Sequence, residues 1–199
     1  MTTEAGGTRG TGGRGRSRRG LPRTADRPRE PRDPENHARE LCLRLLTARP
    51  RTRAELAQAL RRRGIPEETV DRVLGRFDEV GLVDDAAFAE MWVHSRHTHQ
   101  GLGRRALAAE LRRKGVADDI VSEAVAEVDS EAEEQRAREL VRRRLRTLTA
   151  RDEVTRIRRL VGMLARKGYA EGLAYRVVRD ELRQAGADAE LLDEPWPED

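Results

Sequence analysis

The chain has 199 residues, 38% of them charged and only 3% aromatic, and its 40 basic and 36 acidic residues leave a formal net charge of +4. No apolar run approaches the roughly 20 residues of a membrane span, no apolar signal segment follows the N-terminus, and the single Cys42 excludes a disulfide framework, so we expect a cytoplasmic protein with no membrane partner. Few aromatic residues argue against base-stacking RNA-binding sheets, while abundant Ala, Leu, Arg and Glu favour helices.

The two ends of the chain differ in composition from the part between them. Residues 1–36 are rich in Gly, Arg, Pro and Thr and almost devoid of apolar side chains, so we predict a disordered basic arm. Sequence-independent contact with phosphates and a purely solubilising role both remain open for this arm. Residues 188–199 are acidic and Pro-rich and are predicted to form a tail.

Between these ends, three stretches repeat one apolar pattern around the glycines Gly64, Gly115 and Gly168, which lie about 50 residues apart. Leucines occur four and eight positions before each glycine: Leu60 and Leu56, Leu111 and Leu107, Leu164 and Leu160. Residues spaced by four share one helix face, and a glycine can end a helix in a left-handed turn. The pattern therefore predicts three tandem helical repeats.

Each repeat is predicted to hold three helices. Pro66 is expected where a helix opens, Asp84 as an N-cap, and Ser130 with Glu133 as a capping box. The predicted fold class is all-α, with three three-helix repeats in an elongated, curved body whose small cores are completed by packing between neighbours. The predicted repeats are residues 37–83, 84–130 and 131–187.

Basic residues recur just before each of the three glycines. One such cluster is explained by the favourable interaction of cations with a helix C-terminus. Its recurrence in three repeats, with a dense basic run from Arg142 to Arg159, favours a discontinuous basic stripe that binds a polyanion or an acidic protein groove. The residues predicted to bind a partner or DNA are Arg61, Arg62, Arg104, Arg105, Arg112, Arg113, Lys114, Arg142, Arg143, Arg166 and Lys167.

No set of residues indicates catalysis. His94, His97 and His99 have a spacing that can ligate a metal, although exposed histidines at a helix end are commoner. The loop from Gly101 to Gly103 lacks the preceding strand and the lysine of a nucleotide-binding loop. We therefore predict a protein that is not an enzyme, with no catalytic residue, no metal and no cofactor.

The segment GLVDDAAFAEMWVHSRHTHQGLGRRALAAELRRKGV, residues 81–116, resembles the central signature of the RecX family. The resemblance extends over about residues 38–186 and is looser in the third repeat, and the Gly/Arg-rich arm departs from the family pattern. The residues that carry it are Gly81, Leu82, Val83, Asp84, Asp85, Phe88, Ala89, Trp92, Arg96, Gly103, Leu111, Arg112, Lys114, Gly115 and Val116.

This resemblance implies a regulatory protein that lodges in the groove of the RecA–DNA filament. Such a protein restrains RecA strand exchange, ATP hydrolysis and repressor cleavage in homologous recombination, DNA repair and the SOS response. We expect it to be a monomer that meets DNA through the filament and nonspecifically. The alternatives are a general DNA-binding protein built from helix-turn-helix units and a metal-dependent enzyme using the three histidines.

Overall fold

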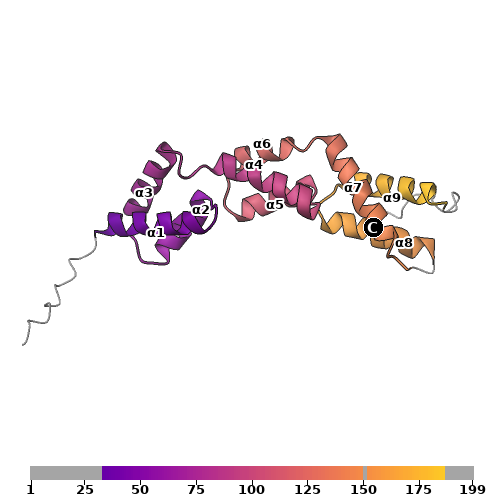
Figure 1. Cartoon of the computed structure of the whole chain (residues 1–199), viewed down its shortest axis with the longest axis horizontal. Helices are drawn as coiled ribbons and strands as arrows, with labels where there is room; N and C mark the ends of the chain where they lie inside the picture. Colours follow the sequence, from indigo (N-terminus) through magenta and orange to yellow (C-terminus); the bar gives the residue numbers. More distant parts are fainter. Residues whose placement is uncertain (1–32, 150–151, 187–199) are drawn as a thin grey trace, which may run out of the picture. The chain divides into compact units, whose positions relative to one another are not determined.

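A computed structural model describes residues 33–149 and 152–186 of the chain. The predicted acidic tail, and the predicted basic arm up to residue 32, lie outside the described residues. Within the described ranges the chain forms nine α-helices and one π-helix and no β-strand (Figure 1). This confirms the prediction of an all-α chain of three three-helix units.

The helices follow one another in three groups. The first unit consists of α1 (Pro34–Ala48), α2 (Arg53–Arg61) and α3 (Glu67–Glu79). The second unit consists of α4 (Asp85–Ser95), the π-helix η1 (Arg96–Gln100), α5 (Arg104–Arg113) and α6 (Asp118–Ala126). The third unit consists of α7 (Ser130–Leu145), α8 (Glu153–Arg166) and α9 (Glu171–Gln184). Pro66 immediately precedes α3, and α1 begins inside the segment predicted as an arm.

Each unit encloses its own hydrophobic core. The six aligned leucines are 0% exposed, which confirms the predicted helix faces. The buried apolar residues form three separate clusters, within residues 38–83, 88–128 and 137–182. The expectation that neighbouring units complete one another's cores is therefore wrong, because each unit buries its apolar side chains among its own helices.

One of two predicted side-chain helix caps is present in the structure. Asp84 caps α4 as predicted, since its Oδ1 accepts a hydrogen bond from the backbone N of Ala87 at 2.9 Å. The capping box predicted for Ser130 and Glu133 is wrong, because Asp129 is the N-cap of α7. Glu133 instead reaches the second unit.

The first and second units meet where α2 begins and α5 ends. The hydroxyl of Thr52 donates a hydrogen bond to the carbonyl oxygen of Lys114 at 2.7 Å, and the backbone N of Arg53 donates to Oδ1 of Asp85 at 2.8 Å. The first N–H groups of a helix have no partner in their own helix. The second unit therefore supplies a partner to the first turn of α2.

The second and third units repeat this arrangement at the start of α5. The backbone N of Gly103 donates to the carbonyl oxygen of Lys167 at 2.8 Å, and the backbone N of Arg104 donates to Oε1 of Glu133 at 2.8 Å. A carboxylate near the start of the next unit's first helix again satisfies an N–H group of the middle helix. The two junctions thus use the same elements in the same way.

The π-helix adds contacts to the second junction, because its C-terminal carbonyl groups face the third unit. Lys167 Nζ donates to the carbonyl oxygen of Gln100 at 2.6 Å. The hydroxyl of Tyr169 donates to the carbonyl oxygen of Gly101 at 3.2 Å. Burial raises the pKa of Tyr169, so its hydroxyl keeps its proton and remains a donor.

The glycines that end the middle helices have the left-handed conformation predicted for them. Gly64, Gly115 and Gly168 have φ values of 74°, 79° and 85°. A Cβ atom at Gly115 would overlap Ala54, and one at Gly168 would overlap Ala106, whereas a Cβ atom at Gly64 would meet nothing within 4 Å. Two of the glycines are thus required by the junctions as well as by their own φ angle.

Replacing Gly168 by Ala is therefore expected to destabilise the protein more than replacing Gly64 by Ala. Both variants lose about 1 kcal/mol to the left-handed backbone, and Gly168→Ala loses about 1–3 kcal/mol more because the methyl group must displace Ala106. Urea unfolding of the two variants measures this difference. Equal losses would contradict the close packing at the junction.

Candidate polyanion-binding cleft

The third unit gathers cations along the groove between α7 and α8. Two adjoining hollows there have volumes of about 550 and 520 Å³ and share Arg144 and Met163. We call them together the α7/α8 cleft, lined by His99, Gln100, Arg136, Leu140, Arg143, Arg144, Thr147, Arg158, Arg159, Met163, Arg166 and Lys167. No carboxylate is among these lining residues, so the cleft is strongly positive.

Helical periodicity explains why these side chains converge. Arg159, Met163 and Arg166 follow one another at intervals of four and three, so they share a face of α8. The core leucines Leu160 and Leu164 occupy the adjoining, buried face. Of the basic residues of the cleft, Arg143 and Arg144 lie in the last turn of α7 and Arg166 in the last turn of α8, where cations interact favourably with the helix dipole.

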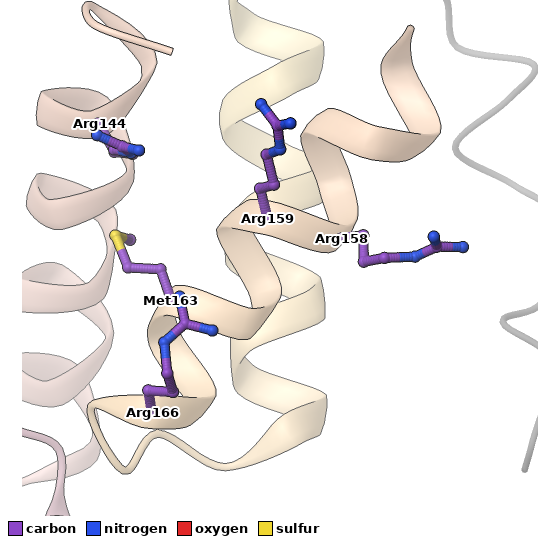
Figure 2. Close-up of a pocket in the computed structure, with 5 residues that line it drawn as sticks. All are labelled: Arg144, Arg158, Arg159, Met163 and Arg166. Atoms are coloured by element: carbon purple, nitrogen blue, oxygen red, sulfur yellow. The ribbon is translucent and has the colours of Figure 1, made fainter. Parts of the chain in front are cut away.

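Most guanidinium groups of the cleft are not neutralised by the protein itself. Within residues 33–149 and 152–186, the side chains of Arg143, Arg144, Arg158 and Arg166 have no hydrogen-bond or ion-pair partner. Figure 2 shows Arg144 and Arg166 on either side of Met163, while Arg158 points to the other side of α8. Unpaired guanidinium groups around an apolar floor are suited to phosphate or carboxylate groups of a partner.

The cleft unites part of the predicted basic stripe. It contains Arg143, Arg166 and Lys167 from the predicted set, and it adds Arg144, Arg158 and Arg159, which the set lacked. The dense basic run was the signal for these additions, but the run spans two helices. The sequence did not show that its two halves face each other across a turn.

Four other predicted residues are exposed, and two of them are engaged in ion pairs. Arg61 pairs with Glu67, and Arg112 Nε lies 2.6 Å from Asp118 Oδ1. Exposed pairs of this kind contribute about 0–1 kcal/mol, so a partner can replace them at little cost. Within the described part of the chain, the side chains of Arg62 and Arg105 have no polar partner.

Arg142 and Arg113 also have contacts within the protein, and Arg113 is 76% exposed. Arg142 Nε lies 2.7 Å from Oε2 of Glu181, a carboxylate that is almost completely buried. Arg113 Nε donates to the carbonyl oxygen of Ala109 at 3.3 Å.

Lys114 is held inside the first junction. Its side chain is only 16% exposed, and its Nζ donates to Oε1 of Glu55 at 3.0 Å. The same ammonium group lies 4.2 Å from the ring centroid of Trp92 and 5.4 Å from that of Phe88, which stacks on Trp92. The contacts of Lys114 therefore join the first unit to the second.

The electrostatics of Glu55 reflect this contact. Burial alone would raise the pKa of its carboxyl group, but the hydrogen bond and charge of Lys114, together with the N–H group of Thr52 and the charge of Arg49, leave the pKa below its ordinary value of 4.5. The Glu55 carboxyl group is therefore ionised at neutral pH, and its contact with Lys114 contributes to the stability of the junction.

His97 and Cys42 make structural contacts, whereas His94 and His99 are exposed and His99 lines the cleft. His97 Nδ1 lies 2.9 Å from the carbonyl oxygen of Leu102, next to the π-helix. No cluster of three or more His, Cys, Asp or Glu side chains suited to a metal ion occurs in the ranges that the structure covers. Cys42 is fully buried in the first core, and burial raises the pKa of its thiol to about 11, so it remains a protonated apolar side chain.

Comparison with known proteins gives the family. Descriptions of the first, second and third three-helix domains of RecX match residues 38–77, 84–125 and 131–178. The chain belongs to the RecX family. The resemblance seen in the sequence is thereby confirmed, and with it membership in a family of regulatory proteins.

Individual RecX proteins are similar over most of their length. Regulatory protein RecX of Amycolatopsis mediterranei is 58% identical over 164 residues, which cover 82% of this chain and 94% of that protein. The Streptomyces coelicolor protein of that name is 56% identical over 168 residues, covering 84% and 89%. The corresponding protein of Mycolicibacterium smegmatis is 53% identical over 161 residues, covering 79% and 86%.

Solved structures of RecX proteins share the fold. The crystal structure of RecX from Lactobacillus salivarius matches with a TM-score of 0.66 at 19% identity, over 75% of this chain and 97% of that one. A second crystal structure, of a regulatory protein RecX, matches with a TM-score of 0.65 at 24% identity, over 74% and 72%. Within the described residues, no helix is both long and apolar enough to cross a membrane.

Lys114→Met is expected to lower the free energy of unfolding by about 1–2 kcal/mol at pH 7, because Glu55 loses its charged donor. The pKa of Glu55 is lower in the folded protein than its ordinary value of 4.5, so its contribution is present above pH 4.5 and is lost as the pH falls through the folded-state pKa. The difference between wild type and variant should therefore shrink at pH 3. Urea unfolding at both pH values measures it.

Arg113→Ala is the matched control for this variant. It removes a neighbouring cation that is 76% exposed and lies 4.0 Å from Glu110, so it should leave stability within about 0.5 kcal/mol of wild type at both pH values. An equal loss in the two variants would contradict the junction role of Lys114.

Proposed function

We propose that this protein regulates RecA by binding the RecA–DNA filament in the cytoplasm, as a monomer, and mainly restrains its recombinase, ATPase and repressor-cleavage activities during DNA repair and the SOS response. Membership in the RecX family supports the regulatory role. The observation that carries the binding mode is the α7/α8 cleft, whose unpaired guanidinium groups are suited to a polyanionic partner.

The cleft is proposed to bind phosphate groups of the DNA or carboxylates of RecA. Arg144 and Arg166 stand on either side of Met163 and so offer two cations to successive anionic groups (Figure 2). Exposed arginines of the other units, such as Arg62 and Arg105, add weaker contacts. Linked weak contacts give the whole chain a higher affinity for a continuous filament than for a single protomer.

No chemical step is part of this proposal. Apart from its arginines, the cleft is lined by His99, Gln100, Leu140, Thr147, Met163 and Lys167, and no contact in the described residues pairs a nucleophile of this set with a base. The protein is therefore proposed to act by binding the filament and shifting the equilibrium between filament states. This requires only that it binds one filament state more tightly than another.

Replacing both Arg144 and Arg166 by Ala should weaken inhibition of the RecA ATPase on single-stranded DNA by about tenfold in protein concentration. Each phosphate contact with single-stranded DNA contributes about 0.7 to the slope of log affinity against log salt, so the slope should fall by about 1.4 if both arginines contact DNA. RecA ATPase assays at several salt concentrations measure both effects.

Arg44→Ala with Arg146→Ala is the matched control. These arginines are exposed, have no polar partner within the described residues and lie outside the cleft. Replacing them removes the same charge as the cleft variant does. Loss of inhibition in the control as large as in the cleft variant would assign the effect to net charge and contradict a specific cleft.

Binding to preassembled RecA filaments should be tighter than binding to bare duplex or bare single-stranded DNA. Fluorescence anisotropy with labelled protein compares the three at one salt concentration. Equal or tighter binding to bare duplex would favour a general DNA-binding protein of helix-turn-helix type and would overturn the proposed filament preference.

A further inference from the structure

A second hollow lies on the other side of α8 from the α7/α8 cleft. This α8/α9 pocket has a volume of about 290 Å³ and is lined by Arg158, Val161, Gly162, Glu171, Gly172 and Tyr175. Arg158 lines both the pocket and the cleft. A polyanion bound in the α7/α8 cleft would not need the apolar walls of this pocket.

Two glycines keep the pocket open without a structural need for them. Gly162 lies inside α8 and Gly172 in the first turn of α9, and neither has a positive φ. A Cβ atom at Gly172 would meet nothing within 4 Å, and one at Gly162 would meet only the flexible end of Arg166, at 3.3 Å. Glycine inside a helix costs about 0.5–1 kcal/mol relative to alanine, and at these two positions it leaves the pocket unfilled by side chains of α8 and α9.

The outer face of α9 leads from this pocket to the end of the helix. Gly172, Tyr175, Arg179 and Arg183 follow at intervals of three, four and four, so they share one face. The Nε atom of Arg179 is buried and has no hydrogen-bond partner within the described residues. Arg179 as a whole is half-buried, so an acidic segment lying along this face can still meet its positive charge.

The segment that directly follows α9 has the chemistry of such an occupant. Residues 187–199 contain no basic residue and a single aromatic, Trp196, between Pro195 and Pro197. Their acidic residues are Asp188, Glu190, Asp193, Glu194, Glu198 and Asp199. An indole matches the apolar walls of the pocket, and carboxylates match the guanidinium groups of Arg158 and Arg179.

The length of this segment is sufficient. Tyr175 lies eleven residues before Gly186, which corresponds to about 16 Å along a helix. The ten residues from Gly186 to Trp196 span up to about 33 Å when extended. The segment can therefore turn at Gly186, where φ is 82°, and return along α9 with chain to spare.

We propose that residues 187–199 fold back along α9 and place the indole of Trp196 in the α8/α9 pocket, with their carboxylates against Arg158 and Arg179. Because Arg158 also lines the α7/α8 cleft, the docked segment competes with a polyanionic partner for this cation and adds negative charge beside the cleft. The segment then acts as an intramolecular brake on partner binding, a consequence that rests on the function proposed above, whereas the docking itself does not.

Tryptophan fluorescence of the full chain tests the docking. The chain has two tryptophans, and subtracting the spectrum of Trp196→Phe from that of wild type isolates Trp196 from Trp92. The Trp196 emission should be blue-shifted and protected from acrylamide. In the background Gly162→Leu with Gly172→Leu, which fills the pocket, acrylamide quenching of Trp196 should rise severalfold.

Gly75→Leu is the matched control, since this glycine lies in α3 with nothing within 4 Å of an added Cβ atom and should leave Trp196 protected. Thermal unfolding checks that the pocket-filling variant is folded. An exposed Trp196 in wild type, or quenching that is unchanged when the pocket is filled, overturns the proposal.

Deletion of residues 187–199 tests the brake. The shortened chain should bind a single-stranded thymidine oligonucleotide about tenfold more tightly at low salt, and a synthetic peptide of residues 187–199 added in excess should reverse the gain. Unchanged affinity with a protected Trp196 overturns the brake and leaves the docking supported. If neither chain binds the oligonucleotide or the filament, the proposed function fails, while the fluorescence result still decides the docking.

Discussion

The first turn of a middle helix needs hydrogen-bond acceptors that its own backbone cannot supply, and the arrangement of the units depends on how this need is met. In α2 and α5 the next unit provides a carboxylate, from Asp85 and Glu133, to a backbone N–H group. The carbonyl oxygen of Lys167 also accepts from a backbone N–H group, that of Gly103, whereas the carbonyl oxygen of Lys114 accepts from the hydroxyl of Thr52. Since the three cores are separate, these polar contacts and the two packed glycines fix the register between neighbouring units. Both α2 and α8 are also capped within their own unit, by Thr52 and Asp152, whereas α5 has no side-chain cap of its own and depends on Glu133 and Lys167 for its first N–H groups.

This constraint separates the cations of the chain into two classes. Lys114 and Lys167, the only lysines, lie at the two junctions. Lys114 contacts a carboxylate of the adjacent unit and an aromatic face of its own unit, and Lys167 contacts a backbone carbonyl of the adjacent unit. Arginines at equivalent helix ends remain at the surface, and their planar guanidinium groups are suited to bidentate contacts with phosphate and carboxylate. Three basic clusters that look alike in the sequence therefore differ in what they can bind.

The sequence predicted the fold well because its signals are local. The paired leucines, the helix-ending glycines and the Asp84 cap each depend on neighbours within a few residues, and each is found as expected. Contacts between distant residues were not predictable in this way. Glu133 has the spacing of a capping box, but its carboxylate accepts a hydrogen bond from the half-buried backbone N–H group of Arg104 in the second unit. The placement of Arg158 and Arg159 beside Arg144 depends on how α7 packs against α8. The site was therefore only partly predicted.

Charge segregation within the third unit explains why a nearly neutral chain presents a strongly positive cleft. On the α7/α9 side, Arg138 lies 2.7 Å from Glu134, 3.0 Å from Asp180 and 3.3 Å from Glu181, and Arg142 shares Glu181. These acids are occupied there and do not reach the α7/α8 side, where the cleft is lined by cations alone among its charged residues. A partner within a Debye length, about 8 Å at physiological salt, responds to this local charge and not to the total of +4. The pairing of acids on one face thus makes the opposite face available to a polyanion.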